Sequence, residues 1–168
     1  YIPNAHGFDQ SIDNLKYIVD NAKDSWVISI QILWWEPTMH EWLIELVTYI
    51  KKNNIRAWLV TNGYFLDDEL IWSLDGYLDY CTISIDGDEK FHNGYRGNRH
   101  SFQNAKRAFD RLIQSNITPE VLMTVNKNNI WLRDDVFAVC KNDPAYLTLK
   151  VIQLSTGNDN TALLLYDT

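Results

Sequence analysis

Apolar residues follow two spacings that alternate along the chain. Short, nearly continuous apolar runs, typical of buried strands, are separated by segments in which apolar residues recur every three or four positions, as on one face of a helix. The helical spacing is clearest where Ala105, Phe109 and Leu112 share a face. Strands are predicted over 26–33, 56–60, 80–85, 120–125 and 146–154. Helices are predicted over 11–22, 40–53, 67–74, 101–116 and 131–140, and a polar loop over 88–100.

Strands that alternate with helices predict an α/β fold with a parallel sheet and right-handed crossovers. Neither a linker nor a low-complexity run interrupts the pattern, so one domain is expected over 1–168. Five strands are too few to close an eight-stranded barrel. The expected architecture is therefore a partial (βα) barrel, in which a curved parallel sheet carries helices on its outer face. A flavodoxin-like open sheet is the competing layout.

Composition narrows the classes of function. The 168 residues are 46% hydrophobic and 22% charged, as in an ordinary globular domain. The net charge of −7 argues against broad binding to nucleic acid or to an anionic membrane surface. The two cysteines, Cys81 and Cys140, are far apart in apolar surroundings, which predicts buried thiols in a reducing cytoplasm. Two thiols are too few to hold an iron–sulfur cluster.

A polar residue lies at or just beyond the end of every predicted strand. The positions are Glu36, Asn62, Ser84 with Asp86, Asn126 and Gln153. Because ligands of parallel α/β folds bind outside the carboxyl ends of the strands, these residues are candidates for a polar site on one rim. Turns favour the same residue types, so a turn role stays open for each. Arg96, in the polar loop, is a candidate for binding a carboxylate at the rim.

Read together, these segments resemble the radical S-adenosylmethionine (SAM) superfamily, in its MoaA-like and peptide-modifying branches. Residues 28–40 resemble the second barrel strand and its Gly-Gly-Glu-Pro motif. Four further segments resemble the third, fourth, fifth and sixth barrel strands and the residues that follow them. In that order, they are 59–63, 82–87, 122–127 and 152–158. Residues 92–97 resemble the His…Arg-Gly loop. Each motif is weak alone, but six in the right order over nearly the whole chain are specific.

The resemblance implies reductive cleavage of SAM at a [4Fe–4S] cluster, which yields a 5′-deoxyadenosyl radical that modifies a peptide or a small organic substrate. It also implies that the backbone of Trp34 and Trp35 cradles the SAM amino group, and that Glu36 contacts the ammonium or braces the loop. Ser84, Asp86 and Asn126 match exits near the ribose or the substrate, and Arg96 matches a residue that reaches the SAM carboxylate. Leu154 and Gly157 match the region that lines adenine.

Two departures qualify this resemblance. The first is the absence of the C-x-x-x-C-x-x-C motif. The chain is therefore expected to start inside a longer protein and to lack the first strand and the cluster loop. Alone, it is expected to bind no cofactor and to be inactive. The second is Trp34-Trp35 in place of the glycine pair, where two indoles would fill part of the SAM site. A missing first strand would also expose a sheet edge, which favours self-association.

Other functions stay open. A degenerate or engineered scaffold that keeps the fold and binds a partner or ligand without catalysis is the alternative to an enzyme. A flavodoxin-like phosphate binder is the third hypothesis, but no glycine-rich loop at a helix start supports it. The sequence upstream of Tyr1 separates the enzyme from the non-catalytic scaffold. Three cysteines there would favour the enzyme, and their absence would favour the scaffold.

Overall fold

The computed structural model describes residues 11–141 and 143–151, which form one five-stranded sheet. The strands are β1 (Ser29–Ile32), β2 (Arg56–Thr61), β3 (Tyr80–Ser84), β4 (Thr118–Val125) and β5 (Leu147–Val151). They lie in the order β1-β2-β3-β4-β5, and all four neighbouring pairs are parallel. The parallel α/β sheet is thus confirmed. Its sequential strand order excludes the flavodoxin-like layout, in which the first strand lies inside the sheet.

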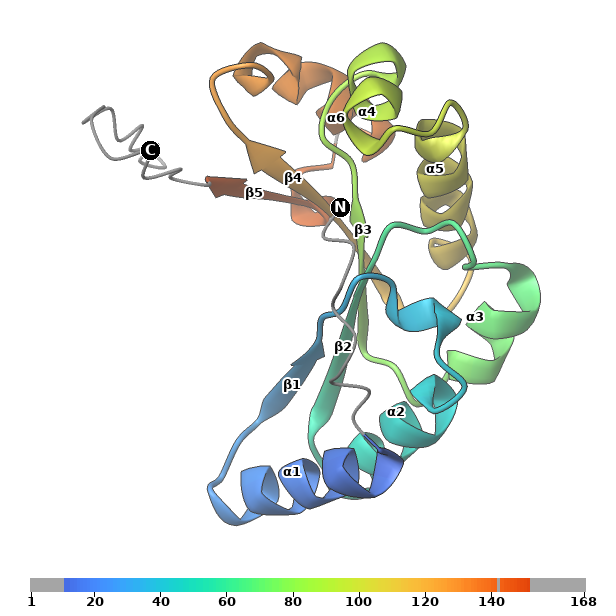
Figure 1. Ribbon diagram of the computed structural model, residues 1–168, viewed down its shortest axis with the longest axis vertical. Helices are drawn as coiled ribbons and strands as arrows, with labels where there is room; N and C mark the ends of the chain where they lie inside the picture. Colours follow the sequence, from blue (N-terminus) through green and yellow to red (C-terminus); the bar gives the residue numbers. More distant parts are fainter. Residues whose placement is uncertain (1–10, 142, 152–168) are drawn as a thin grey trace.

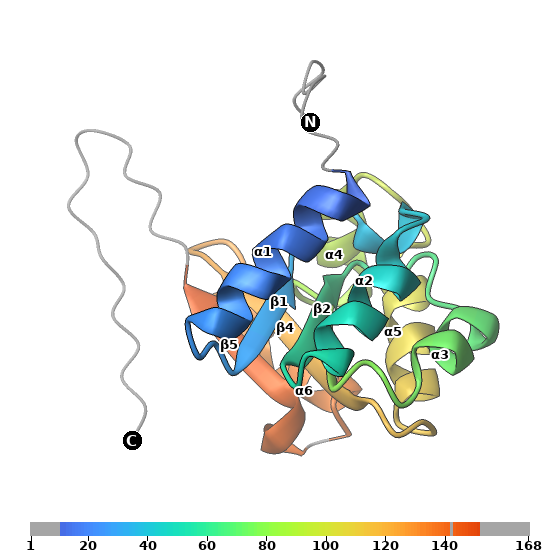
Figure 2. The same ribbon diagram turned by 90° about the horizontal axis from the view of Figure 1, so that it is seen from below.

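One helix precedes the first strand, and the others lie in the connections that follow β1, β2, β3 and β4. The helices are α1 (Ile12–Asp24), α2 (Leu43–Lys52), α3 (Asp68–Leu74), α4 (Glu89–Arg96), α5 (Ser101–Leu112) and α6 (Arg133–Val139). Short 3₁₀ turns lie at Pro37–Met39, Ile130–Leu132 and Pro144–Tyr146. Figures 1 and 2 show the strands curving, with α2, α3 and α5 on the outer side. Among the described residues, no helix is long and apolar enough to cross a membrane.

Side-chain caps begin the helices where the sequence places them. Ser11 accepts a hydrogen bond from the amide of Asn14, and Asp67 accepts one from the amide of Leu70 at 2.9 Å. Such caps satisfy backbone donors that have no partner within the helix. Both predicted helix starts are confirmed.

The polar loop predicted over 88–100 is wrong, because this segment contains helix α4. Asp88 caps it by accepting a 2.7 Å hydrogen bond from the amide of Phe91, and Gly97 ends it in the left-handed conformation at φ +66°. An Asp before and a Gly after eight residues is a capping signal. The segment has few apolar residues, so the spacing of apolar positions did not reveal the helix.

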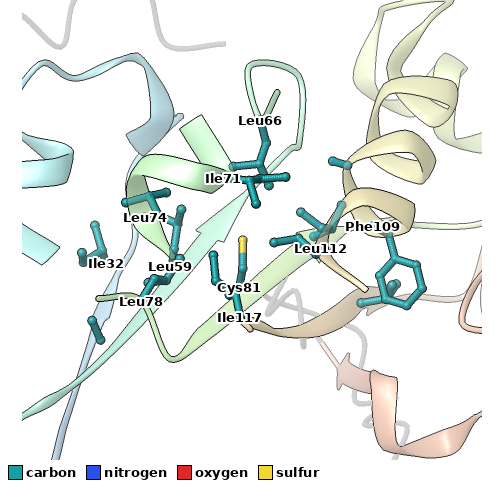
Figure 3. Packing of buried hydrophobic residues seen from close by; sticks show 14 of the residues in the cluster. Ile32, Leu59, Leu66, Ile71, Leu74, Leu78, Cys81, Phe109, Leu112 and Ile117 are labelled. Atoms are coloured by element: carbon teal, nitrogen blue, oxygen red, sulfur yellow. The ribbon is translucent and has the colours of Figure 1, made fainter. Parts of the chain in front are cut away.

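The hydrophobic core lies between the sheet and its outer helices. Alternate residues of the central strands, such as Leu59, Cys81 and Val121, are fully buried there, and Phe109 and Leu112 of α5 pack on the same side. Figure 3 shows the Cys81 sulfur enclosed by aliphatic side chains. Burial raises the pKa of the Cys81 thiol, and it raises that of the buried Cys140 thiol to about 11. Both cysteines are therefore core residues.

One edge of the sheet is formed by β1, which pairs only with β2 among the described residues. Unpaired strand edges favour pairing with another chain. Self-association through this edge stays a prediction.

Candidate functional site

Glu36, which follows β1, joins the ends of the first two strands. It is buried, and its carboxylate accepts hydrogen bonds from the hydroxyl of Thr61 and from the amide of Asn62 at 2.8 Å. It also accepts hydrogen bonds from the amide and the hydroxyl of Thr38, which places it as the cap of the 3₁₀ turn that follows. With four donors on its two oxygens, Glu36 is a brace for the loop 33–39.

Asn62 and Gly63 form a tight turn directly after β2. The Asn62 side chain accepts a 2.8 Å hydrogen bond from the amide of Tyr64. Gly63 has φ +76°, and a Cβ there would lie 3.0 Å from the Cβ of Ala108. Glycine is therefore required both for the backbone conformation and for the close approach of α5. These contacts support a turn role for the pair.

The two indoles of Trp34 and Trp35 have different surroundings. Trp34 is 46% exposed, meets the ring of His40 edge-on at 6.1 Å, and lines an apolar cavity of about 250 Å³ together with Ile32 and Leu46. Trp35 is 67% exposed, and the structure gives its ring no aromatic partner among the described residues. Trp34 is thus engaged with the helical side of β1, which leaves Trp35 as the indole available to a ligand at this rim.

A second polar cluster lies beyond β3, around the fully buried Asp86. The Arg96 guanidinium donates to Oδ2 of Asp86 through Nε at 2.9 Å and lies 2.6 Å from it through Nη2. Oδ1 accepts the amide of Thr124 at 3.2 Å. The carboxylate thus ties α4 to the end of β4. The Arg96 side chain is 33% exposed, so part of its guanidinium faces solvent.

His92 supports this carboxylate from inside α4. Its Nδ1 accepts the amide of Asp86 at 3.1 Å, which puts the ring proton on Nε2, 2.9 Å from the Ser101 hydroxyl. Burial, and to a smaller extent the nearby Arg96 cation, lower the pKa of His92 to about 4, although the Asp86 carboxylate acts in the opposite direction. The neutral ring therefore acts as a fixed hydrogen-bonding bridge and not as a proton carrier near neutral pH.

Asn129 completes the second cluster. Its buried amide donates to the backbone carbonyls of Asp86 and Thr124, both at 2.9 Å, and its Oδ1 accepts the amide of Asn126 at 2.7 Å. The side chain of Asn126 in turn caps the following turn through the amide of Asn128. Asn129 was not among the residues predicted from the sequence. Its only signal is its place in an Asn-rich run after a strand, where amides often bond to the backbone.

Ser84 lies at the end of β3, between the two clusters in the strand order. It is half-buried, and its hydroxyl has no hydrogen-bond partner among the described residues. It is thus a donor and acceptor available to a ligand. The parallel sheet brings Glu36, Ser84, Asp86, Arg96 and Asn126 to the same end of the strands. The remaining candidates, Leu154 and Gly157, lie outside the described residues, as does Gln153.

The described residues do not fit a [4Fe–4S] cluster. Such a cluster needs thiolate ligands, and both thiols are buried in the core with raised pKa values. Within the described ranges, no group of three or more His, Cys, Asp or Glu side chains is arranged to hold a metal ion. At the polar rim, the Ser84 hydroxyl and the solvent-facing part of the Arg96 guanidinium are the polar groups available to a ligand.

Comparison with known proteins agrees with the geometry. The family model described as "Radical SAM superfamily" matches residues 3–132, which is most of the chain. Over 96 residues the chain is 32% identical to the Fe-coproporphyrin III synthase of Methanosarcina barkeri, covering 56% of this chain and 24% of that protein. The chain therefore spans about a quarter of that relative's length.

Solved structures share the fold. Native anSMEcpe with bound AdoMet and the Kp18Cys peptide superposes with a TM-score of 0.70 at 21% identity, covering 89% of this chain and 46% of that one. SuiB of Streptococcus suis bound to its precursor peptide SuiA superposes with a TM-score of 0.68 at 18% identity, covering 88% and 34%. The partial-barrel architecture expected from the sequence is thereby confirmed.

Proposed function

Because the chain belongs to the radical SAM superfamily, we propose that it is the SAM-binding core of an enzyme that cleaves SAM reductively to modify a peptide or a small organic substrate. The observation that carries this proposal is the polar rim that described residues form at the carboxyl ends of β1, β2, β3 and β4 in the parallel sheet. When bound, the cluster and SAM supply the radical chemistry, and the protein positions them.

The rim residues have distinct proposed roles. The backbone at Trp34 and Trp35 holds the SAM amino group, on a loop that Glu36 fixes from below. Arg96 holds the SAM carboxylate with the part of its guanidinium that faces solvent. Ser84 and Asn126 contact the ribose or the substrate.

Asp86 takes a different role from the ribose contact that the resemblance implies. Its carboxylate is fully buried and both oxygens are engaged, one by Arg96 and one by the amide of Thr124. We therefore assign it the positioning of Arg96. Leu154 and Gly157 keep their proposed place beside adenine.

A peptide substrate is supported by solved structures of similar fold, because three of them contain bound peptides. The net charge of −7 disfavours an acidic peptide and favours a neutral or basic one.

The test compares the natural gene product with the isolated 168-residue chain. Both are reconstituted anaerobically with iron and sulfide, reduced with dithionite and given SAM. We expect 5′-deoxyadenosine from the gene product and none from the isolated chain, since its described residues offer no cluster site. Absence of 5′-deoxyadenosine from a gene product that has bound its cluster would favour the alternative, a scaffold of the same fold without catalysis.

A further inference from the structure

The inner face of the sheet carries a polar row that spans four strands. Side chains alternate between the two faces of a strand, so the neighbours of the core residues Leu59 and Cys81 point away from the outer helices. The strand register then sets Trp58 opposite Tyr80 and Thr82 opposite Glu120. This inner face is the side of the curved sheet opposite α2, α3 and α5 in Figures 1 and 2.

Glu120 is the end point of a directed chain of hydrogen bonds on this face. The indole of Trp58 donates to the hydroxyl of Thr82 at 2.6 Å, and that hydroxyl donates to Oε2 of Glu120 at 2.7 Å. The hydroxyl of Thr148, on β5, donates to Oε1. Two neutral donors thus fix the carboxylate. An ionised carboxylate accepts about four hydrogen bonds, so it has capacity for a further donor.

This negative charge has no counterion within the described ranges. No Lys or Arg there forms an ion pair with Glu120, although its side chain is half-buried. Removing a charge from water costs free energy unless a partner compensates it. Beside it, the rings of Trp58 and Tyr80 lie 5.4 Å apart, and aromatic faces attract cations. A fixed carboxylate next to an aromatic pair is complementary to an ammonium or guanidinium group.

We propose that Glu120 binds the cationic group of the substrate, and that the substrate is a peptide with a lysine- or arginine-like side chain directed into the concave sheet. This inference rests on the proposed function and names its substrate class. Ser84, at the rim, lies two residues beyond Thr82 on β3, which is about 7 Å at the rise of a strand. The distance along β3 from the rim at Ser84 to Thr82, which lies opposite Glu120, is therefore comparable to the length of an extended lysine side chain.

A purely structural role for Glu120, as a link between β3, β4 and β5, makes a different prediction. A structural link needs only an acceptor for Thr82 and Thr148, and it gives no affinity for cations. Charge-selective binding therefore separates the two roles.

The experiment follows the Trp58 indole N–H of the isolated chain by two-dimensional ¹⁵N NMR, with the resonance assigned through Trp58→Phe. The probes are n-butylammonium, n-butylguanidinium, 1-butanol and butyrate. We expect a saturable shift with the two cations only, because occupancy beside Glu120 polarises the Trp58–Thr82–Glu120 chain. The tighter of the two cations tells whether the site prefers a lysine-like or an arginine-like group.

Glu120→Gln should weaken cation binding at least tenfold, whereas Glu89→Gln, an exposed carboxylate on α4, should leave it unchanged. If Glu120→Gln does not fold, the charge selectivity of the unaltered chain decides alone. An equal response to 1-butanol, or binding to Glu120→Gln within twofold of the unaltered chain, overturns the proposal. Because the test uses neither SAM nor a cluster, its outcome is independent of whether the gene product forms 5′-deoxyadenosine.

Discussion

Arg96 lies on Asp86 with Nη2 and Nε at 2.6 and 2.9 Å from the same carboxylate oxygen, and this pair links helix α4 to the sheet. Asp86 is fully buried while a third of the Arg96 side chain is exposed. The buried Asp86 carboxylate therefore orients the partly exposed Arg96 guanidinium. A guanidinium held in this way loses little further side-chain entropy when it binds a carboxylate.

Removal of the buried carboxylate should destabilise the fold. Asp86→Ala leaves the Arg96 cation and the Thr124 amide without their acceptor. We expect a loss of about 2–3 kcal/mol, below the value for a fully buried pair because water reaches part of Arg96. Asp68→Ala is the matched control, because Asp68 pairs with Arg111 at 3.0 Å but its side chain is 84% exposed. We expect the control to lose about 1 kcal/mol or less. Urea unfolding of the isolated chain measures both, and equal losses would contradict the assigned role of Asp86.

The neutral state of His92 should make stability depend on pH. Its folded pKa of about 4 lies below the ordinary value of 6.5, so the unfolded chain binds a proton first as the pH falls. The contribution of His92 to the free energy of unfolding is full above pH 6.5. It declines as the pH falls toward 4, by about 3 kcal/mol in total.

Urea midpoints at about pH 7.5 and about pH 5 measure this decline. His92→Asn keeps an acceptor for the amide of Asp86 but does not titrate, so its stability should fall less between the two conditions. His100→Asn, at an exposed position, should retain the full decline. A decline that is identical in His92→Asn and in the unaltered chain would show that another group causes it.

The two indoles should respond differently to replacement by glycine. Trp35→Gly removes an exposed indole that is expected to fill part of the SAM site, so we expect the gene product's KM for SAM to fall several-fold. Trp34→Gly removes part of the lining of the apolar cavity beside α1. It should lower stability by about 1–2 kcal/mol, less than truncation of a fully buried aromatic because the ring is 46% exposed, with little effect on KM. An unchanged KM in Trp35→Gly would mean that this indole does not restrict the SAM site.

The sequence was sufficient to predict the parallel sheet, because β2, β3 and β4 are bounded apolar runs with helical segments between them. It did not predict α4, whose stability comes from the Asp88 cap, the Gly97 end and buried hydrogen bonds of His92. Contacts of this kind join residues through tertiary structure and leave no periodic pattern.

The same limit applies to the candidate site. Glu36, Ser84 and Asp86 could be selected because each lies at or just beyond the end of a strand, but the pairing of buried Asp86 with Arg96 depends on how α4 folds back over the end of β3. Glu120 was missed because it lies inside a strand, two residues from its start. Only the register of β3 with β4 brings it beside Thr82.

Hydrogen–deuterium exchange of the reconstituted gene product with and without SAM tests most directly whether the carboxyl ends of the strands bind the cofactor. We predict slower exchange over 33–36, 61–63, 84–88 and 124–128, and no change at the opposite strand ends over 27–29, 54–57 and 117–119. Protection at those opposite ends, or no protection at 84–88 under saturating SAM, would contradict the account.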